Sequence, residues 1–236
     1  MKKISWISVT QVRLFRNDEI PLSLLQLPLI IQQSKVALGF TQDPIVQPAP
    51  SPDLPGSIVF VNGQFVTDSA VFAVPQLQIE PRRIRISISA TSDIANLLFE
   101  RLKQVMISVD TRSEKPTYDP LVLTEETGTA VNLDSTLRRL FLGDAGERLL
   151  AGLQATLESH GAVASIEPVG LRYHVRFSEL PEALRKYGVT LLEKDIRIEV
   201  RNQTPAEDKN YFIVSPNSSD SHFALIDYLE NTFGEK

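Results

Sequence analysis

The chain has 236 residues, 42% of them hydrophobic and 22% charged, so it can bury a sizeable core as one large domain or two small ones. It contains no cysteine, which excludes disulfides, thiolate metal centres and cysteine nucleophiles and favours a cytoplasmic location. Its net charge of −5 is uneven, because residues 1–118 carry 12 basic and 10 acidic side chains whereas residues 119–236 carry 12 and 19. We expect no nucleic-acid partner, since phosphate binding relies on clustered Lys and Arg.

The N-terminal 56 residues predict a strand followed by irregular chain. Residues 4–16 are rich in Ile and Val and predict the strand, and they lack the apolar run of a signal peptide. The most apolar stretch, residues 22–31, is too short to span a bilayer, so no membrane partner is expected. Pro21 and Pro28 should limit any helix here to a turn or two. Five prolines over residues 44–55 predict a surface loop; a ligand for an SH3-like groove is the alternative.

Residues 57–90 predict an antiparallel meander. Asn62-Gly63 lies between two apolar runs and is typical of a hairpin turn, and Glu80-Pro81-Arg82 predicts another turn. Over residues 83–89, Ile alternates with Arg and Ser, which indicates a strand with one buried and one wet face. An amphipathic helix should follow over residues 92–106.

The polar stretch from residue 110 to 135 predicts a boundary between two halves, residues 1–118 and 119–236. In the second half, Asp144 and Glu147 form a capping-box pattern that starts a helix over residues 144–160. Strands are expected at 162–168, 171–177, near 190–200 and at 211–214, with a short helix over 180–188. A last helix should occupy residues 219–233.

These elements predict an α+β protein: a mainly antiparallel β-sheet with three principal amphipathic helices packed on it. Two similar hairpin-plus-helix halves are one possibility, and a single continuous sheet shared by both halves is another. Aligning Ser92-Asp93 with Ser219-Asp220, 127 residues later, gives four identities in fifteen positions. Any two capped amphipathic helices could share these identities. We therefore favour independent origins of two similar helices over common ancestry, and a gene duplication stays open.

The three histidines of the chain differ in their value as site candidates. His160 ends a helix, where a cation is favoured, and His222 lies beside Asp220 and Ser221 in a first helical turn, where adjacent residues rarely form a triad. On a strand over 171–177, Arg172, His174 and Arg176 would share one face and could bind a phosphate or carboxylate. The alternative is a solvated face whose arginines pair with Asp195 or Glu199 on a neighbouring strand. Arg82, Arg83 and Arg85 allow a similar anion hypothesis.

The sequence contains no glycine-rich phosphate loop, no metal-binding spacing and no nucleophile elbow, so we expect no cofactor, no metal and no catalytic residue. It therefore predicts a non-enzymatic cytoplasmic protein that acts through a protein partner or as a homo-oligomer, because long antiparallel strands can add another chain's strand at an uncovered edge. The alternative is an enzyme or small-anion binder that uses the face of Arg172, His174 and Arg176.

Overall fold

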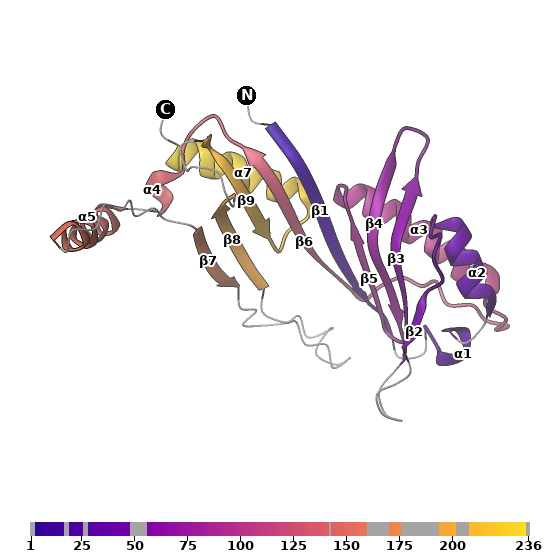
Figure 1. The fold of residues 1–236 in the computed structure, drawn as a ribbon. Coiled ribbons are helices and arrows are strands. Elements are labelled where there is room, and N and C mark those ends of the chain that lie inside the picture. The colour runs from indigo at the N-terminus through magenta and orange to yellow at the C-terminus, as the bar shows by residue number, and fades with distance from the viewer. Residues whose placement is uncertain are drawn as a thin grey trace.

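The chain builds one long antiparallel sheet with helices on one face (Figure 1). The computed structural model describes residues 3–16, 19–25, 28–47, 56–141, 143–159, 170–175, 194–201 and 208–234. Within these residues nine strands pair in the order β2-β3-β4-β5-β1-β6-β9-β8-β7, and every pairing is antiparallel. The predicted α+β class is confirmed.

The strands are β1 (Lys3–Leu14), β2 (Ile45–Gln47), β3 (Ser57–Val66), β4 (Val71–Glu80), β5 (Arg83–Ile88), β6 (Val122–Asn132), β7 (Gly170–Val175), β8 (Lys194–Val200) and β9 (Asn210–Ser215). The helices are α1 (Leu22–Leu25), α2 (Pro28–Ala37), α3 (Ser92–Val109), α4 (Arg138–Phe141), α5 (Asp144–Ser159) and α7 (Ser219–Phe233).

The strand order is symmetric about the central pair β1 and β6. On either side of this pair lie β5 and β9, then β4 and β8, then β3 and β7. The equivalence extends to the numbering. β5 and β9 have the same length and start 127 residues apart, and α3 and α7 also start 127 residues apart. The two hairpin-plus-helix units therefore occupy equivalent places on the two sides of the sheet.

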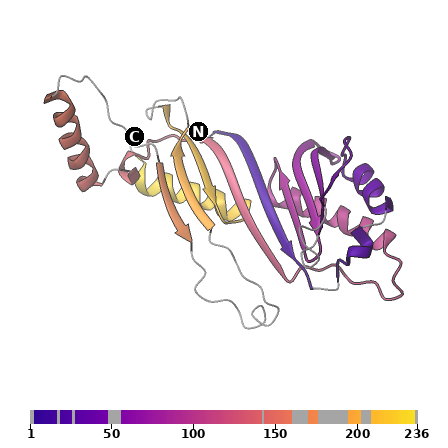
Figure 2. The ribbon, with the colours of Figure 1, turned by 60° about the horizontal axis from the view of Figure 1, so that its bottom comes forward.

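Helices α3 and α7 cover one face of the sheet (Figure 2). Two hydrophobic cores lie between the sheet and its helices. In the first, Leu98 and Leu102 of α3 pack with the isoleucines of β5, which alternate with polar residues as the sequence predicts. In the second, Ile226 and Leu229 of α7 pack with Ile213 of β9. In both views α5 stands beside the sheet instead of on it, and its Leu149 and Leu153 are exposed.

The meander over residues 57–90 is present, but the turn predicted at Asn62-Gly63 is wrong. These residues lie inside β3, and the chain reverses at Thr67–Ala70, where the Thr67 N–H donates to the Ala70 carbonyl oxygen at 2.9 Å. Asn62 takes a φ of 56° within the strand. Gly63 is needed for packing, because a Cβ there would lie 2.4 Å from Cε1 of Phe40.

The polar stretch from residue 110 to 135 contains β6, the eleven-residue central strand, whose β-branched Val and Thr residues suit a pleated sheet. One other expectation is wrong. The segment after Pro28 forms a ten-residue helix instead of a turn or two. Proline is tolerated at the first position of a helix because its missing N–H would have no partner there.

Some predicted features lie outside the described residues: the strand at 162–168, the helix at 180–188, residues 48–55 of the proline-rich loop, and the side chains of the capping box. One sheet runs through residues of both halves, and the division into domains 1–118 and 119–236 stays a prediction. Among the described helices, none has the length and apolar character needed to cross a membrane.

Candidate binding cleft

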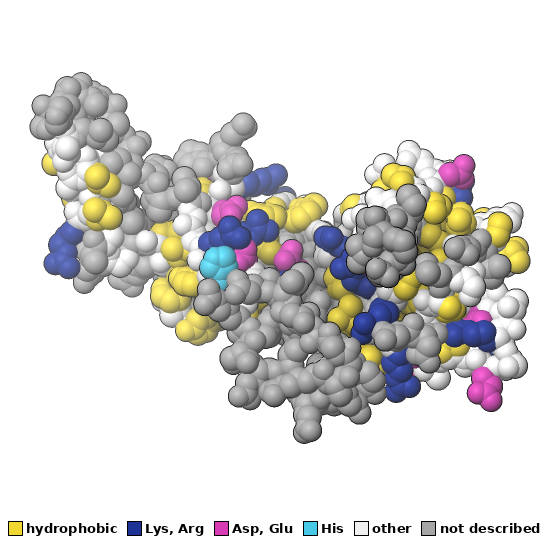
Figure 3. All heavy atoms as spheres, turned by 90° about the horizontal axis from the view of Figure 1, so that it is seen from below, with side chains coloured by type: hydrophobic (Ala, Val, Ile, Leu, Met, Phe, Trp, Pro, Cys, Tyr) yellow, Lys and Arg dark blue, Asp and Glu magenta, His cyan; other side chains and the backbone are white. Residues whose placement is uncertain are grey.

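One face of the sheet, here called the open face, points away from α3 and α7. Period-two alternation places Arg83 and Arg85 of β5 on this face, opposite the buried isoleucines. The register continues the row across the centre, from Arg85 to Val12 of β1 and on to Thr124 of β6. Figure 3 shows several basic side chains on this side of the molecule, some of them next to a histidine.

The centre of the sheet contains an incompletely paired strand. β1 pairs with β6 over the whole of Val122–Asn132, whereas β9 pairs with β6 only from Thr127 onward. β9 ends because Pro216 follows it and has no N–H for the ladder. The side-chain hydroxyl of Thr127 then donates to the carbonyl oxygen of Asn217 at 2.8 Å. This hydrogen bond holds the turn that leads from β9 to α7. Among the described residues, Val122–Glu126, here called the free edge, pair with β1 alone.

The backbone hydrogen bonds that β1 and β6 make with their outer neighbours, β5 and β9, show which backbone groups of the free edge point outward. The Phe15 N–H donates to the Arg82 carbonyl oxygen at 2.8 Å, so odd-numbered residues of β1 bond to β5 and even-numbered ones bond to β6. Likewise, the Leu133 N–H donates to the Lys209 carbonyl oxygen at 3.0 Å, so odd-numbered residues of β6 bond towards β9. The N–H and C=O groups of Leu123 and Glu125 therefore point out of the free edge.

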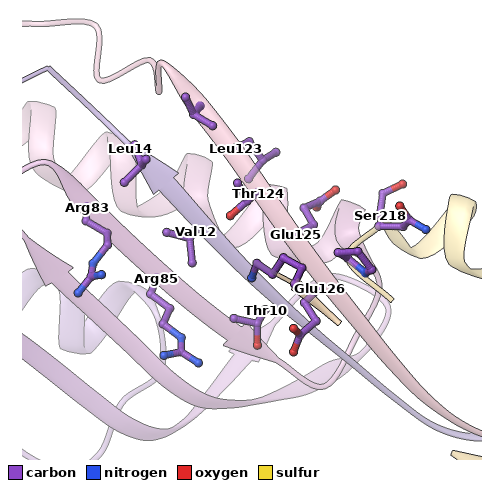
Figure 4. Close-up of a pocket in the computed structure, with 14 residues that line it drawn as sticks. Thr10, Val12, Leu14, Arg83, Arg85, Leu123, Thr124, Glu125, Glu126 and Ser218 are labelled. Atoms are coloured by element: carbon purple, nitrogen blue, oxygen red, sulfur yellow. The ribbon is translucent and has the colours of Figure 1, made fainter. Parts of the chain in front are cut away.

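A cleft of about 610 Å³ opens at the free edge (Figure 4). Its surface is built by five parts of the chain: the open-face residues of β1, the arginines of β5, the start of β6, the end of β8 nearest the cleft, and the turn between β9 and α7. Arg83 and Arg85 of β5 lie on one side of it, across Val12 from Thr124. Ser218, the N-cap of α7, lies on the opposite side.

The charged side chains of the cleft differ in how they are neutralised. Arg83 donates to the carboxylate of Glu80 through Nε and Nη2, both at 2.8 Å. Among the described residues, neither Arg85 nor Lys194 has a side-chain hydrogen bond or an ion pair, and the same holds for Glu126. Glu125 turns its side chain to the other face, where it accepts a hydrogen bond from Gln11. As far as the structure describes the chain, the cleft thus presents two unpaired cations and one unpaired carboxylate.

The predicted row of Arg172 and His174 also lies on the open face, on β7, and both residues contact Asp195 of β8. Arg172 donates to the carboxylate through Nε at 2.8 Å and also through Nη2, and His174 Nδ1 lies 2.7 Å from Oδ1. The hydrogen bond from Arg172 holds the pKa of Asp195 below its usual value, and Coulomb attraction by the same arginine adds to the effect. The structure thus shows the pairing with Asp195 that the sequence offered as the alternative.

Arg176, the third member of the row, lies outside the described residues, as does His160. Anion binding by Arg172, His174 and Arg176 stays a prediction. Any anion there would compete with Asp195 for the same donors.

His222 of α7 is fully buried, at 0% exposure, against β6 and β9. Its Nε2 is 2.9 Å from the hydroxyl of Thr129 and its Nδ1 is 2.8 Å from the hydroxyl of Ser215. Burial lowers its pKa to about 4, so the ring is neutral at physiological pH. Its partners are these two strand residues and not its sequence neighbours Asp220 and Ser221, and its contacts join α7 to the sheet.

A buried polar network lies on the helix face behind the cleft. Gln11 donates to Asn96 Oδ1 at 3.0 Å and to Glu125, and Arg13 donates to Asn96 Oδ1 at 2.7 Å. Arg13 is 3% exposed, its guanidinium lies 4.1 Å from the centre of the Phe99 ring, and burial lowers its pKa to about 10. These contacts hold Glu125 against β1 and leave its backbone edge open.

Sequence reasoning found Arg83 and Arg85 as anion candidates but missed Lys194, Glu126 and the free edge. Two signals pointed to the edge: β6 is eleven residues long against six for β9, and Pro216 stops β9. Neither could be used without knowing that these two strands are neighbours.

Within the described residues, no cluster of three or more His, Asp or Glu side chains could hold a metal ion. No protein-family model matches the chain, and no curated protein matches it. A function is therefore proposed from its own residues.

Proposed function

We propose that the protein is a non-enzymatic cytoplasmic binding protein that takes up an extended segment of a partner protein along the free edge of β6. The observation that carries this proposal is the single-sided pairing of Val122–Glu126 inside the cleft. An unpaired strand edge is a template on which another chain can add a strand. The absence of cysteine supports the cytoplasmic location.

The geometry suits a short segment. A strand added beside the free edge would continue the line of β9 past Ser215 and would bond to the backbone of Leu123 and Glu125. These two residues offer four backbone groups, and each hydrogen bond contributes about 1 kcal/mol net. Association costs at least about 4 kcal/mol of lost freedom, so backbone bonds alone would give weak binding. Side-chain contacts in the cleft must supply the rest of the affinity.

A proline at position 123 tests the proposal. In Leu123→Pro the outward N–H is lost, while the ladder to β1, which uses even-numbered residues of β6, is kept. Leu123→Ala is the matched control, because it removes the same side chain and keeps the N–H. A displayed library of random seven-residue peptides is selected on the wild-type protein, and the enriched peptides are measured on all three proteins. We expect binding to the wild type and Leu123→Ala and at least tenfold weaker binding to Leu123→Pro.

Equal binding of the enriched peptides to Leu123→Pro would overturn strand addition at this edge, and so would the failure of any peptide to be enriched. Circular dichroism and thermal unfolding of both variants show whether Leu123→Pro is folded. If it is not, backbone N-methylation of the selected peptides removes the same hydrogen bonds from the other side. Self-association appears in the same proteins as a wild-type dimer that Leu123→Pro abolishes.

A further inference from the structure

We infer that the segment taken up at the free edge is acidic, with carboxylate side chains that face Arg85 and Lys194; this inference rests on the function proposed above. Both cations line the cleft, and neither has a partner among the described residues. They stand against one unpaired carboxylate, that of Glu126. Arg83 is a third cation of the cleft, but it already forms an ion pair with Glu80.

Arg85 is placed to reach the added strand. It lies in the same cross-strand row as Val12 and Thr124, whose short side chains lie between it and the position of the added strand (Figure 4). Three strand spacings, about 14 Å, would divide β5 from the added strand. An extended arginine side chain and an extended glutamate side chain on the added strand together span this distance above Val12 and Thr124.

Lys194 lies on the other side of the cleft. It is the first residue of β8, and the register of β8 with β9 places it just beyond the point where β9 ends. A segment in line with β9 would therefore run between Thr124 and Lys194. Side chains of a strand alternate between faces, so every second residue of the segment would face the open side, where Arg85 lies.

Charge also sets the preferred sequence. With Arg85 and Lys194 unpaired, a lysine-bearing segment would bring like charges together in the cleft, whereas a glutamate-bearing segment would form new pairs. Exposed pairs contribute about 0.2–1 kcal/mol each, so charge selects between segments more than it sets their affinity. Affinity for an acidic segment should also fall as salt is raised.

The test uses three synthetic probes on the full chain. The first is an acetylated, amidated heptapeptide in which Val and Glu alternate; the second has Lys in place of Glu; the third is the acidic peptide with N-methylated backbone. Binding is followed by fluorescence anisotropy at low and physiological salt. We expect the acidic peptide to bind at least about fivefold more tightly than the lysine peptide. In Arg85→Glu and Lys194→Glu this preference should vanish or reverse.

Arg148→Glu is the matched control, since it makes the same change of charge at an exposed position on α5 outside the cleft, and it should keep the preference. Arg85→Ala and Lys194→Ala should weaken binding of the acidic peptide about two- to fivefold. These two variants replace the charge-reversal variants if the latter do not fold.

The outcomes separate the two proposals. If the acidic and lysine peptides bind equally and N-methylation abolishes binding, the acidic preference is wrong and strand addition stands. If the N-methylated acidic peptide binds as well as the unmodified one, the cations select acids but strand addition is wrong. If neither peptide binds the wild type, both proposals fall.

Discussion

Ser92 and Ser219 exchange hydrogen bonds at the centre of the molecule. The N–H of Ser92 donates to Oγ of Ser219 at 3.1 Å, and the N–H of Ser219 donates to Oγ of Ser92 at 2.9 Å. Each serine is the first residue of its helix, α3 or α7, and both are buried. A first-turn N–H has no partner within its own helix, so each helix satisfies one such group of the other. The two equivalent units therefore meet through a reciprocal contact.

Removing either hydroxyl should destabilise the protein. Ser92→Ala leaves the buried N–H of Ser219 unpaired, and Ser219→Ala does the same to Ser92. We expect each variant to lose about 1–2 kcal/mol of unfolding free energy in urea titrations. The double variant should lose less than the sum, because breaking one bond loosens the geometry of the other. Ser221→Ala, at an exposed position of α7, should stay within about 0.5 kcal/mol of wild type. Single variants as stable as Ser221→Ala would show that the reciprocal contact contributes nothing.

Buried His222 should make the protein sensitive to mild acid. The unfolded chain binds a proton at this residue below a pKa of about 6.5, whereas the folded chain does so only below about 4. Between these values the unfolded state binds more protons, so the free energy of unfolding falls as the pH falls. The loss attributable to His222 should reach about 3 kcal/mol at pH 4.

The comparison with His222→Gln isolates this contribution, since glutamine can bond to Thr129 and Ser215 but does not titrate. Unfolding free energies of wild type and variant are measured from pH 7 to pH 4, and the wild type should show the steeper decline. Parallel curves for wild type and His222→Gln would contradict the burial of a neutral ring.

Asp110 should stabilise the end of α3 at neutral pH. Burial would raise its pKa, but hydrogen bonds from Arg112 and from the buried Tyr118 hydroxyl outweigh this and lower the pKa to about 2. The stabilisation is complete above the unfolded pKa of about 3.8 and is lost as the pH falls through about 2. Asp110→Asn should therefore cost about 2 kcal/mol at pH 7, with a smaller difference near pH 2.

Asp119→Asn provides the comparison, because Asp119 is exposed and pairs with Lys103 at the surface. It should unfold at nearly the wild-type urea concentration. A cost for Asp110→Asn that does not change between pH 7 and pH 2 would show that the carboxylate's charge is not what stabilises the site.

The elements with strong local signals were predictable from sequence. The last helix begins at Ser219 and ends at Phe233 as expected, because its apolar residues recur at helical spacing after a serine-rich start. The alternation of Ile with Arg and Ser in β5 is sufficient by itself to put Arg83 and Arg85 together on the face opposite the isoleucines.

The features that failed depend on partners distant in sequence. Asn62-Gly63 is a hairpin turn by local preference, yet β3 continues through it because Phe40 packs on Gly63. The strand β6 was not predicted, because its polar Thr and Glu residues give no clear strand pattern, and β1 pairs along its whole length. The cleft combines residues of β1, β5, β6 and β8, so only the sheet order could reveal it.

Residue-resolved amide exchange tests the central claim, uptake of an extended segment at the free edge, most directly. In the protein alone, the N–H groups of Leu123 and Glu125 should exchange fast and those of Thr124 and Glu126, which bond to β1, should be protected. Saturation with the alternating Val and Glu peptide should protect Leu123 and Glu125 and leave Thr124 unchanged. Protection of Leu123 and Glu125 before any peptide is added, or fast exchange of both at saturation, would contradict strand addition at this edge.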